Sequence, residues 1–502
     1  MKIMENITRL FFVNKRFAAF KTFISCAFFL FGFSIDLNAQ TNSTFTSNGT
    51  FTVPAGVTNV QVQAWGGGGG GGGVNGSNTQ TRAGGGGSGG TFTLNPSVAV
   101  NPLSGTITVT VGQGGTAGTN NADGGNGGTS TFASATPVTA VGGNGGATGD
   151  GSPQYGSGGA FRVGVTYDGG AGAAASGGNS GGGGGGAGSS GDGGNATGTS
   201  AGAAGAGGGG AGAAGRTNNG DGISATALGG GGSGGRSSNN TDRNGGSGFR
   251  GQVVVTYTCP TYALSVNPTS NSVCTSDGST AVVTLTGTTT SLPVGVYTVT
   301  YSRSLPNASG LTATMTVSAA GTGNFTAVGL TSPGNVTITI TNLASGGCST
   351  AVSAFNTVVI PVSASATANS GSSISVCYTS GSIAVSGGSS ATNYSSILWT
   401  TNGSGALANE TSLTLCEYTP SEADLLSGSV TLTLTVFGVS PCGNISSSKV
   451  LNLFSLPTAT GVSLCQGGSG NLTAGVLGGS LTIQGTWTST PVAARPDTGT
   501  NS

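Results

Sequence analysis

The chain has 502 residues, a length that corresponds to about three or four domains. Glycine supplies 101 residues, charged side chains only 6%, and histidine none. The chain therefore lacks the usual general base near neutral pH and the commonest metal ligand. Five of the 14 basic and two of the 14 acidic residues lie in 1–39, which leaves nine against twelve, a net charge of −3. This balance excludes a nucleic-acid binder, which needs a basic patch.

The N-terminal segment has the order of a secretory signal. Lys15, Arg16 and Lys21 precede an apolar run over 23–33, and small residues follow up to Ala39. This order predicts cleavage after Ala39. The apolar run is shorter than the roughly 20 residues that a membrane helix needs. We therefore expect an exported protein without a transmembrane span.

A glycine-rich domain is expected over residues 40–258. Its glycines cluster in blocks, among them Gly66–Gly73, Gly84–Gly90, Gly181–Gly186 and Gly207–Gly210. Such composition is typical of flexible linkers. However, polyglycine also has an ordered form, an extended left-handed helix with three residues per turn, like polyproline II. Eight glycines in this form would reach about 25 Å, which is long enough to build a bundle.

Strand-like segments frame the glycine blocks and favour the ordered form. The segments 51–54, 60–65, 106–111 and 252–257 carry the alternating apolar and polar residues of half-buried strands. A flexible linker has no use for buried valines. We therefore predict a β-sandwich frame that carries a bundle of polyglycine helices.

The runs FTVPAGVTNVQVQAWGGGGGGGG, SGTITVTVGQGG and GFRGQVVVTY resemble the glycine-rich domain of bacterial surface proteins and phage tail adhesins. They are more distantly similar to the extracellular glycine-rich region of anaplastic lymphoma kinase. The resemblance implies a sandwich frame, a polyglycine bundle and exposed loops that recognise a partner.

The charged residues of this domain are all Arg or Asp. In one interpretation, arginines bind loop carbonyls and aspartates shape turns. In the other, Arg162 and the aromatic residues Tyr155, Phe161 and Tyr167 form a ligand surface.

The composition changes at Tyr262. From there on, the sequence contains short runs in which Thr alternates with apolar residues such as Val and Leu, for example 296–300 and 430–436. Runs of this kind are typical of β-sandwiches. The fold class predicted for the whole chain is therefore all-β, with the glycine-rich domain followed by tandem Ig-like sandwiches. Their expected bounds are 259–364, 365–455 and, for an incomplete third module, 456–502.

Cysteine–aromatic pairs repeat in these modules. Cys377 and Trp399 are as far apart in the sequence as Cys465 and Trp487. The same spacing from Cys274 reaches the neighbour of Tyr297. We expect these three aromatic residues, Tyr297, Trp399 and Trp487, to lie in the module cores.

A cysteine near the second strand and a late second cysteine fit an Ig-like sandwich that is stapled across its sheets. This pattern predicts the pairs Cys274–Cys348 and Cys377–Cys442. It leaves Cys259, Cys416 and Cys465 without assigned partners, with Cys416 as an alternative to Cys442.

Residues 421–442, SEADLLSGSVTLTLTVFGVSPC, resemble the Ig-like and PKD-like repeats of large secreted adhesins from Gram-negative gliding bacteria. The resemblance implies export by the type IX secretion system and a place outside the cell or on its outer surface. That system requires a C-terminal sorting domain, which the sequence does not contain. We therefore expect the chain to be a fragment.

The sequence predicts no enzyme and no cofactor. Glu422 and Asp424 are the closest acidic pair, and their surroundings are typical of a turn rather than of facing catalytic carboxylates. The favoured function is a non-enzymatic adhesin that binds an extracellular glycan, surface polymer or protein. The alternative is a purely structural matrix or stalk element, and a less favoured one is ice binding.

Overall fold

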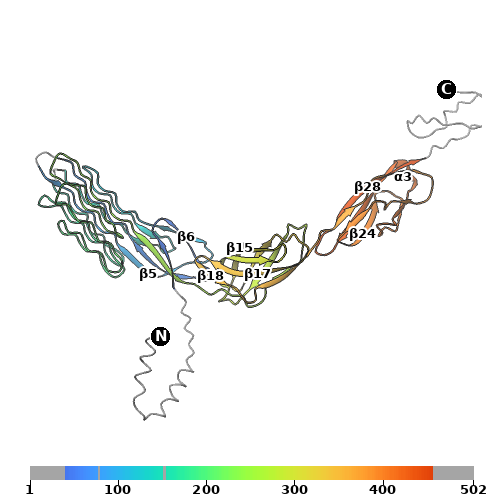
Figure 1. The fold of residues 1–502 in the computed structure, drawn as a ribbon, viewed down its shortest axis with the longest axis horizontal. Helices are drawn as coiled ribbons and strands as arrows, with labels where there is room; N and C mark the ends of the chain where they lie inside the picture. The colour runs from blue at the N-terminus through green and yellow to red at the C-terminus, as the bar shows by residue number, and fades with distance from the viewer. Residues whose placement is uncertain (1–39, 77–79, 151–153, 456–502) are drawn as a thin grey trace, which may run out of the picture.

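The computed structural model describes residues 40–76, 80–150 and 154–455, which form three bodies in a row along a shallow arc (Figure 1). The predicted signal segment, the expected third module, Cys465 and Trp487 lie outside the described residues. Strands and extended backbone dominate, and within the described ranges the only α-helix is α3 (Glu422–Ser427). The all-β fold class is confirmed.

The first body begins with a sandwich of two four-stranded sheets. Phe51, Val109, Phe132, Val253 and Val255 meet between the sheets and are buried. The first sheet has the order β1 (Gln40–Phe45), β10 (Gln252–Thr258), β3 (Asn59–Trp65), β5 (Phe92–Ala99). The second has the order β2 (Gly49–Thr52), β6 (Thr106–Thr110), β7 (Ser130–Phe132), β8 (Val138–Ala140). The four predicted framing strands are confirmed as β2, β3, β6 and β10.

The glycine blocks form the predicted polyglycine bundle, the stack of extended traces at one end of Figure 1. In the block 66–73, every third N–H donates to the same neighbour: Gly66, Gly69 and Gly72 bind the carbonyls of Thr91, Ser88 and Gly85 at 2.8–2.9 Å. The other N–H groups bind 122–128 and 246–249 in the same way, and the carbonyls accept from 115–118, 143–149 and 232–235. This three-residue repeat with six neighbours is the polyglycine II arrangement.

Glycine is required at these positions because the neighbours approach the backbone directly. A Cβ on Gly70 would lie 2.0 Å from the carbonyl oxygen of Thr116, and one on Gly89 would lie 1.8 Å from that of Gly185. The blocks 84–90, 181–186 and 229–235 are enclosed in the same way. Gly207 and Gly208 differ, because their φ values of 81° and 98° make the turn between two outer helices.

Outer helices of the bundle carry polar side chains that accept N–H groups from the adjacent helix. They occur in pairs three residues apart, which matches the helical repeat. The carboxylate of Asp123 accepts from Thr148 N–H and the amide of Asn126 from Gly145 N–H. The same arrangement is formed by Asp192 with Asn195 and by Asp221 with Ser224. These aspartates connect neighbouring helices, whereas the sequence interpretation expected aspartates to shape turns.

The second body, the first module, holds one strongly bent sheet with the order β11-β13-β16-β15-β14-β17-β19-β12, and β18 pairs with β17. Tyr297, Tyr301, Met315 and Ile338 fill its core. Its strands are β11 (Thr269–Ser270), β12 (Val273–Cys274), β13 (Thr280–Thr286), β14 (Gly295–Arg303), β15 (Ala308–Ala319), β16 (Thr322–Val328), β17 (Gly334–Ser345), β18 (Cys348–Ala351) and β19 (Thr357–Ser363).

The third body, the second module, packs a four-stranded sheet of order β21-β28-β27-β24 against smaller sheets around buried Trp399 and Tyr418. Its strands are β20 (Thr367–Asn369), β21 (Ile374–Tyr378), β22 (Ile383–Ala384), β23 (Ser390–Thr392), β24 (Tyr394–Thr401), β25 (Ala406–Ala408), β26 (Glu417–Thr419), β27 (Ser429–Gly438) and β28 (Ile445–Ser455).

Two further strands, β4 (Arg82–Ala83) and β9 (Arg236–Ser237), pair in the glycine-rich domain.

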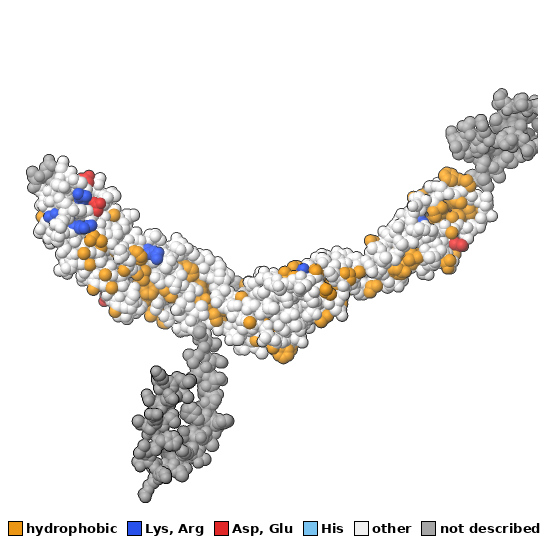
Figure 2. All heavy atoms as spheres, viewed as in Figure 1, with side chains coloured by type: hydrophobic (Ala, Val, Ile, Leu, Met, Phe, Trp, Pro, Cys, Tyr) orange, Lys and Arg blue, Asp and Glu red, His pale blue; other side chains and the backbone are white. Residues whose placement is uncertain are grey.

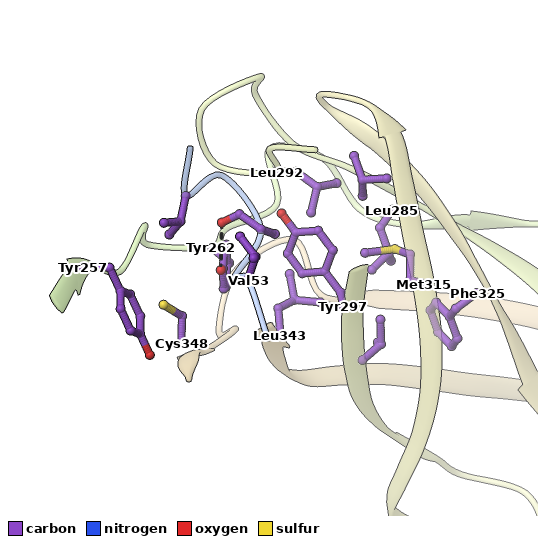
Figure 3. Packing of buried hydrophobic residues seen from close by; sticks show 14 of the residues in the cluster. Val53, Tyr257, Tyr262, Leu285, Leu292, Tyr297, Met315, Phe325, Leu343 and Cys348 are labelled. Atoms are coloured by element: carbon purple, nitrogen blue, oxygen red, sulfur yellow. Dashed lines mark hydrogen bonds between the residues drawn. The ribbon is translucent and has the colours of Figure 1, made fainter. Parts of the chain in front are cut away.

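The core of the glycine-rich domain continues into the first module. Figure 3 shows Val53 and Tyr257 of the domain close to Tyr262, Tyr297 and Cys348. The Tyr262 hydroxyl donates to the carbonyl of Ala55 at 3.1 Å. A junction with shared apolar packing and buried hydrogen bonds resists bending.

The disulfide bonds differ from the predicted pairs and correct them. Cys259 is bonded to Cys348 and Cys274 to Cys442, with Cα separations of 5.4 and 4.9 Å, while Cys377 is a free, exposed thiol. Cys274 and Cys348 each bond to a cysteine outside the sheet of the first module, so they do not pair with one another. The Cys274–Cys442 bond therefore joins the first module to the second, and the Cys259–Cys348 bond fastens the sheet of the first module to the residue that directly follows the glycine-rich domain.

Candidate binding surface

The glycine-rich domain exposes large apolar side chains mainly at one place. Phe161, Val163 and Val165 have exposed fractions of 55%, 70% and 79%, and they alternate with Arg162 and Gly164. Only two other large apolar side chains of this domain, Leu103 and Ile223, are exposed among the described residues. We call residues 161–165 the hydrophobic loop. Contiguous exposed apolar side chains of this kind mark interaction sites.

The hydrophobic loop is held in place from both sides. The carbonyl of Arg162 accepts the Gly169 N–H at 3.1 Å, and the Asp168 carboxylate accepts the Gly164 N–H at 2.8 Å. Beyond the loop, the hydroxyl of Thr166 accepts the N–H of Leu94 in β5 at 2.9 Å. A loop that is already ordered loses little conformational entropy when it binds.

An aromatic stack anchors the end of the loop on the sandwich. Tyr167 stacks on Phe92 with ring centroids 6.1 Å apart, and Phe92 packs on Trp65 at 4.8 Å. Phe92 is fully buried and Tyr167 is half-buried. Tyr167 therefore anchors the end of the hydrophobic loop on the sandwich, and its half-buried ring offers little exposed surface to a ligand.

The structure separates the four residues of the predicted ligand surface. Phe161, Arg162 and Tyr167 lie in or beside the hydrophobic loop, but Tyr155 pairs with Ala83 at the other end of the helix 84–90. Tyr167 pairs with Phe92, nine residues further along that helix, which places the two tyrosines about 28 Å apart at 3.1 Å per residue. Tyr155 belongs to a different surface.

That second surface is the distal tip of the bundle, where charged side chains gather (Figure 2). Arg82 and Arg236 lie on paired strands, and Arg243 pairs with Val74 nearby. Several contacts are structural: Arg236 donates to the carbonyl of Gly178, and Arg216 to that of Asp221. These contacts agree with the interpretation that arginines bind loop carbonyls. They leave fewer donors for a ligand.

The acidic pair of the second module has a structural role in this fold. Asp424 lies in α3, where the sequence predicted a turn, and forms a capping box with Ser421. Its buried carboxylate accepts from the Tyr418 hydroxyl at 2.6 Å and from the N–H groups of Gly405 and Ser404 at 2.8 and 2.9 Å. Burial alone would raise the pKa of Asp424, but these hydrogen bonds outweigh burial and hold the pKa well below its ordinary value.

The second module also buries a lysine and a thiol. Lys449 is buried beside Trp399, with Nζ 5.2 Å from the ring centroid, and donates to the carbonyl of Gly387 at 3.3 Å. Burial lowers the pKa of Lys449. Burial, reinforced by Glu410, raises the pKa of the Cys416 thiol to about 11, so this thiol is unreactive while the module is folded.

No group of three or more His, Cys, Asp or Glu side chains that suits a metal ion occurs in the described part of the chain. The same residues contain no helix that is long and apolar enough to cross a membrane.

Comparison with known proteins relates the first body to a known family. Residues 43–258 match a family model described as a glycine-rich domain. This match supports a glycine-rich domain in this part of the chain. Among solved structures, the chain is similar to one titled "Anomalous substructure of Titin-A168169", with 13% identity, a TM-score of 0.18, and coverage of 38% of this chain and 97% of that one. No curated protein matches the sequence.

Sequence reasoning identified Phe161 and Arg162 but missed Val163 and Val165. The alternation of Phe161, Val163 and Val165 with smaller or polar residues is the signal that was available. This alternation is typical of a short strand, and only the tertiary structure shows that its apolar side chains are not covered by another element.

Proposed function

We propose that this protein is a secreted, non-enzymatic adhesin whose glycine-rich domain binds an extracellular protein or surface polymer through the hydrophobic loop. The observation that carries the proposal is the exposure of Phe161, Val163 and Val165 on a loop that is fixed by hydrogen bonds. The exposure of apolar side chains to water is unfavourable in free energy, and burial against a complementary apolar surface of a partner removes this penalty.

The body that follows supports a display role. The glycine-rich domain and the first module share a core, Cys259–Cys348 fastens the first module to the residue that directly follows the domain, and Cys274–Cys442 ties the first module to the second. Such a stalk of covalently joined β-modules would hold the hydrophobic loop at a fixed distance from its anchor. Disulfide bonds persist mainly in oxidising compartments.

Export is part of the proposal. The predicted signal over 1–39 and the resemblance of 421–442 to repeats of Gram-negative adhesins support a place outside the cell or on its outer surface. Type IX secretion is the route that this resemblance implies.

The test compares a triple variant and a double control variant of the full chain for binding to bacterial cells, purified surface polymers and glycan arrays. The loop variant is Phe161→Ser, Val163→Ser, Val165→Ser, and the control is Leu103→Ser, Ile223→Ser, which removes the other exposed apolar side chains of the domain. We expect the loop variant to lose binding and the control to keep it, with unchanged circular dichroism in both.

Equal binding by the loop variant and the natural chain would refute the role of the loop. If the natural chain binds none of these surfaces, the alternative of a structural stalk or matrix element is favoured. Thermal hysteresis measured on the same samples tests ice binding by the alanine-rich outer helices of the bundle.

A further inference from the structure

The two disulfide bonds follow one rule of placement. Cys348 lies in β18, between β17 and β19, and bonds to Cys259, which directly follows the last strand of the glycine-rich domain. Cys442 lies between β27 and β28 and bonds to Cys274 of the first module. In both cases, a cysteine between the penultimate and the last large strand of a module bonds to a cysteine that precedes that module's own sheet: Cys442 bonds to the first module, and Cys348 bonds to the residue that directly follows the glycine-rich domain.

The two modules share the strand order that underlies this rule. The order β12-β19-β17-β14 in the first module corresponds to β21-β28-β27-β24 in the second. The first strand of each set pairs in parallel with the last strand of its module. Cys348 and Cys442 therefore occupy corresponding connections.

Cys377 corresponds in the same way to Cys274. Cys274 lies opposite Ser363 in the parallel pair β12–β19, and Cys377 lies opposite Phe454 in the parallel pair β21–β28. The spacing that separates Cys377 from Trp399 in β24 leads from Cys274 to Val296 in β14, the neighbour of Tyr297. Cys274 bonds forward to the following module, whereas Cys377 is exposed and has no disulfide partner among the described residues.

We propose that Cys377 is the attachment site for a following module of the same type, to which it bonds through the cysteine between that module's last two large strands. The reaction is thiol–disulfide exchange: two thiols lose two electrons and two protons, and a small disulfide such as oxidised glutathione is reduced to two thiols. The stalk then becomes a series of modules in which each is covalently tied to the next.

Neither remaining cysteine fits as the partner. Cys416 is fully buried in the core of the second module. Cys465 stands before Trp487 at the spacing that separates Cys377 from Trp399, so by sequence it corresponds to the forward-bonding position rather than to Cys442. The partner expected for Cys377 has the position of Cys442, in the next repeat.

A first experiment uses the 502-residue chain. The oxidised protein is alkylated with iodoacetamide without denaturant, digested with chymotrypsin and analysed by mass spectrometry. We expect alkylated Cys377 together with the two bonds Cys259–Cys348 and Cys274–Cys442. A bond from Cys377 to Cys465 or to Cys416 would overturn the proposal.

A second experiment appends a further module of the same type. A copy of residues 364–455 is appended directly after Phe454, because Ser363, the counterpart of Phe454, is followed by residue 364 in the natural chain. The second module has a hydrophobic core of its own, so the copy brings a complete core. The exposed Ile445 is changed to Val in the copy, which marks its peptides by mass.

After oxidation with glutathione, we expect Cys377 to lose its alkylation and to appear in a disulfide with the copied Cys442. The matched control carries Cys442→Ser in the copy only and should keep Cys377 alkylated. Full alkylation of Cys377 in the extended chain, with the copied module folded by circular dichroism, would refute the proposal. This outcome is independent of ligand binding by the hydrophobic loop.

Discussion

The substitution Gly70→Ala tests whether the close approach of backbones makes glycine obligatory in the bundle. Gly70 lies in the block with six neighbours, and its new Cβ would lie 2.0 Å from the carbonyl oxygen of Thr116. An ordinary contact begins near 3.4 Å, so the segment 115–118 must retreat by roughly 1.4 Å. No side-chain rotation can relieve a contact between a Cβ and a backbone atom.

The expected loss follows from the bonds that hold this segment. Gly115 N–H donates to Gly68 at 2.7 Å, and Gly118 N–H donates to Gly71 at 2.9 Å. Losing both hydrogen bonds costs about 1–3 kcal/mol, and overpacking adds about 1–3 kcal/mol. Alanine stabilises by about 0.4–1 kcal/mol through the unfolded state. The net expectation is a destabilisation of about 3 kcal/mol, a large part of the total stability of a domain.

Gly191→Ala is the matched control, because its Cβ would make only ordinary contacts of 3.5 Å with Ala206. Stability is measured by amide hydrogen exchange with mass spectrometry over a urea series, on peptides from 66–91. We expect a large loss for Gly70→Ala and a change below about 1 kcal/mol for the control. Similar stability of the two variants would refute the argument from backbone contact.

Four further predictions concern other features. Ser88→Ala should destabilise the bundle by about 1–3 kcal/mol in urea unfolding, because the buried Ser88 hydroxyl accepts the Asn144 N–H at 2.7 Å; an unchanged midpoint would contradict this. The low pKa of Asp424 stabilises the second module above the ordinary carboxyl pKa of about 4, and this contribution should be lost as the pH falls below it. Asp424→Asn should lower the unfolding temperature at pH 7 and remove that acid dependence; parallel pH profiles would argue against it. In alkylation at pH 8, Cys377 should react in the folded chain and Cys416 only in denaturant, and early labelling of Cys416 would show that the module opens. Cys442→Ser should broaden the distance distribution in small-angle X-ray scattering by loosening the joint between the modules, and an identical curve would show that the remaining contacts suffice.

The framing strands β2, β3, β6 and β10 were predictable because local alternation of apolar and polar residues reports which face is buried. The sandwich strands that escaped prediction have weaker signals. β1 (Gln40–Phe45) is almost entirely polar, and β5 (Phe92–Ala99) contains Pro96, which is typical of an edge strand. Both lie at the edges of their sheet, where one partner strand suffices.

The binding surface was predictable only in part. Phe161 and Arg162 were found from composition, but Tyr155 was grouped with them although the bundle places it about 28 Å from Tyr167. An extended helix carries residues that are close in sequence far apart in space. The exposure of Val163 and Val165 depends on the absence of a neighbour, which local sequence does not encode.

By itself, the sequence determined the all-β class and predicted the ordered polyglycine bundle, because both follow from a regular spacing of residues along the chain. The tertiary structure alone decided which glycine helix bonds to which and which cysteines pair. Glycine blocks are chemically identical, so their partners depend on how the chain turns between them. Disulfide partners depend on how successive bodies meet, and the bonds therefore join Cys259 to Cys348 and Cys274 to Cys442 across the joints of the chain.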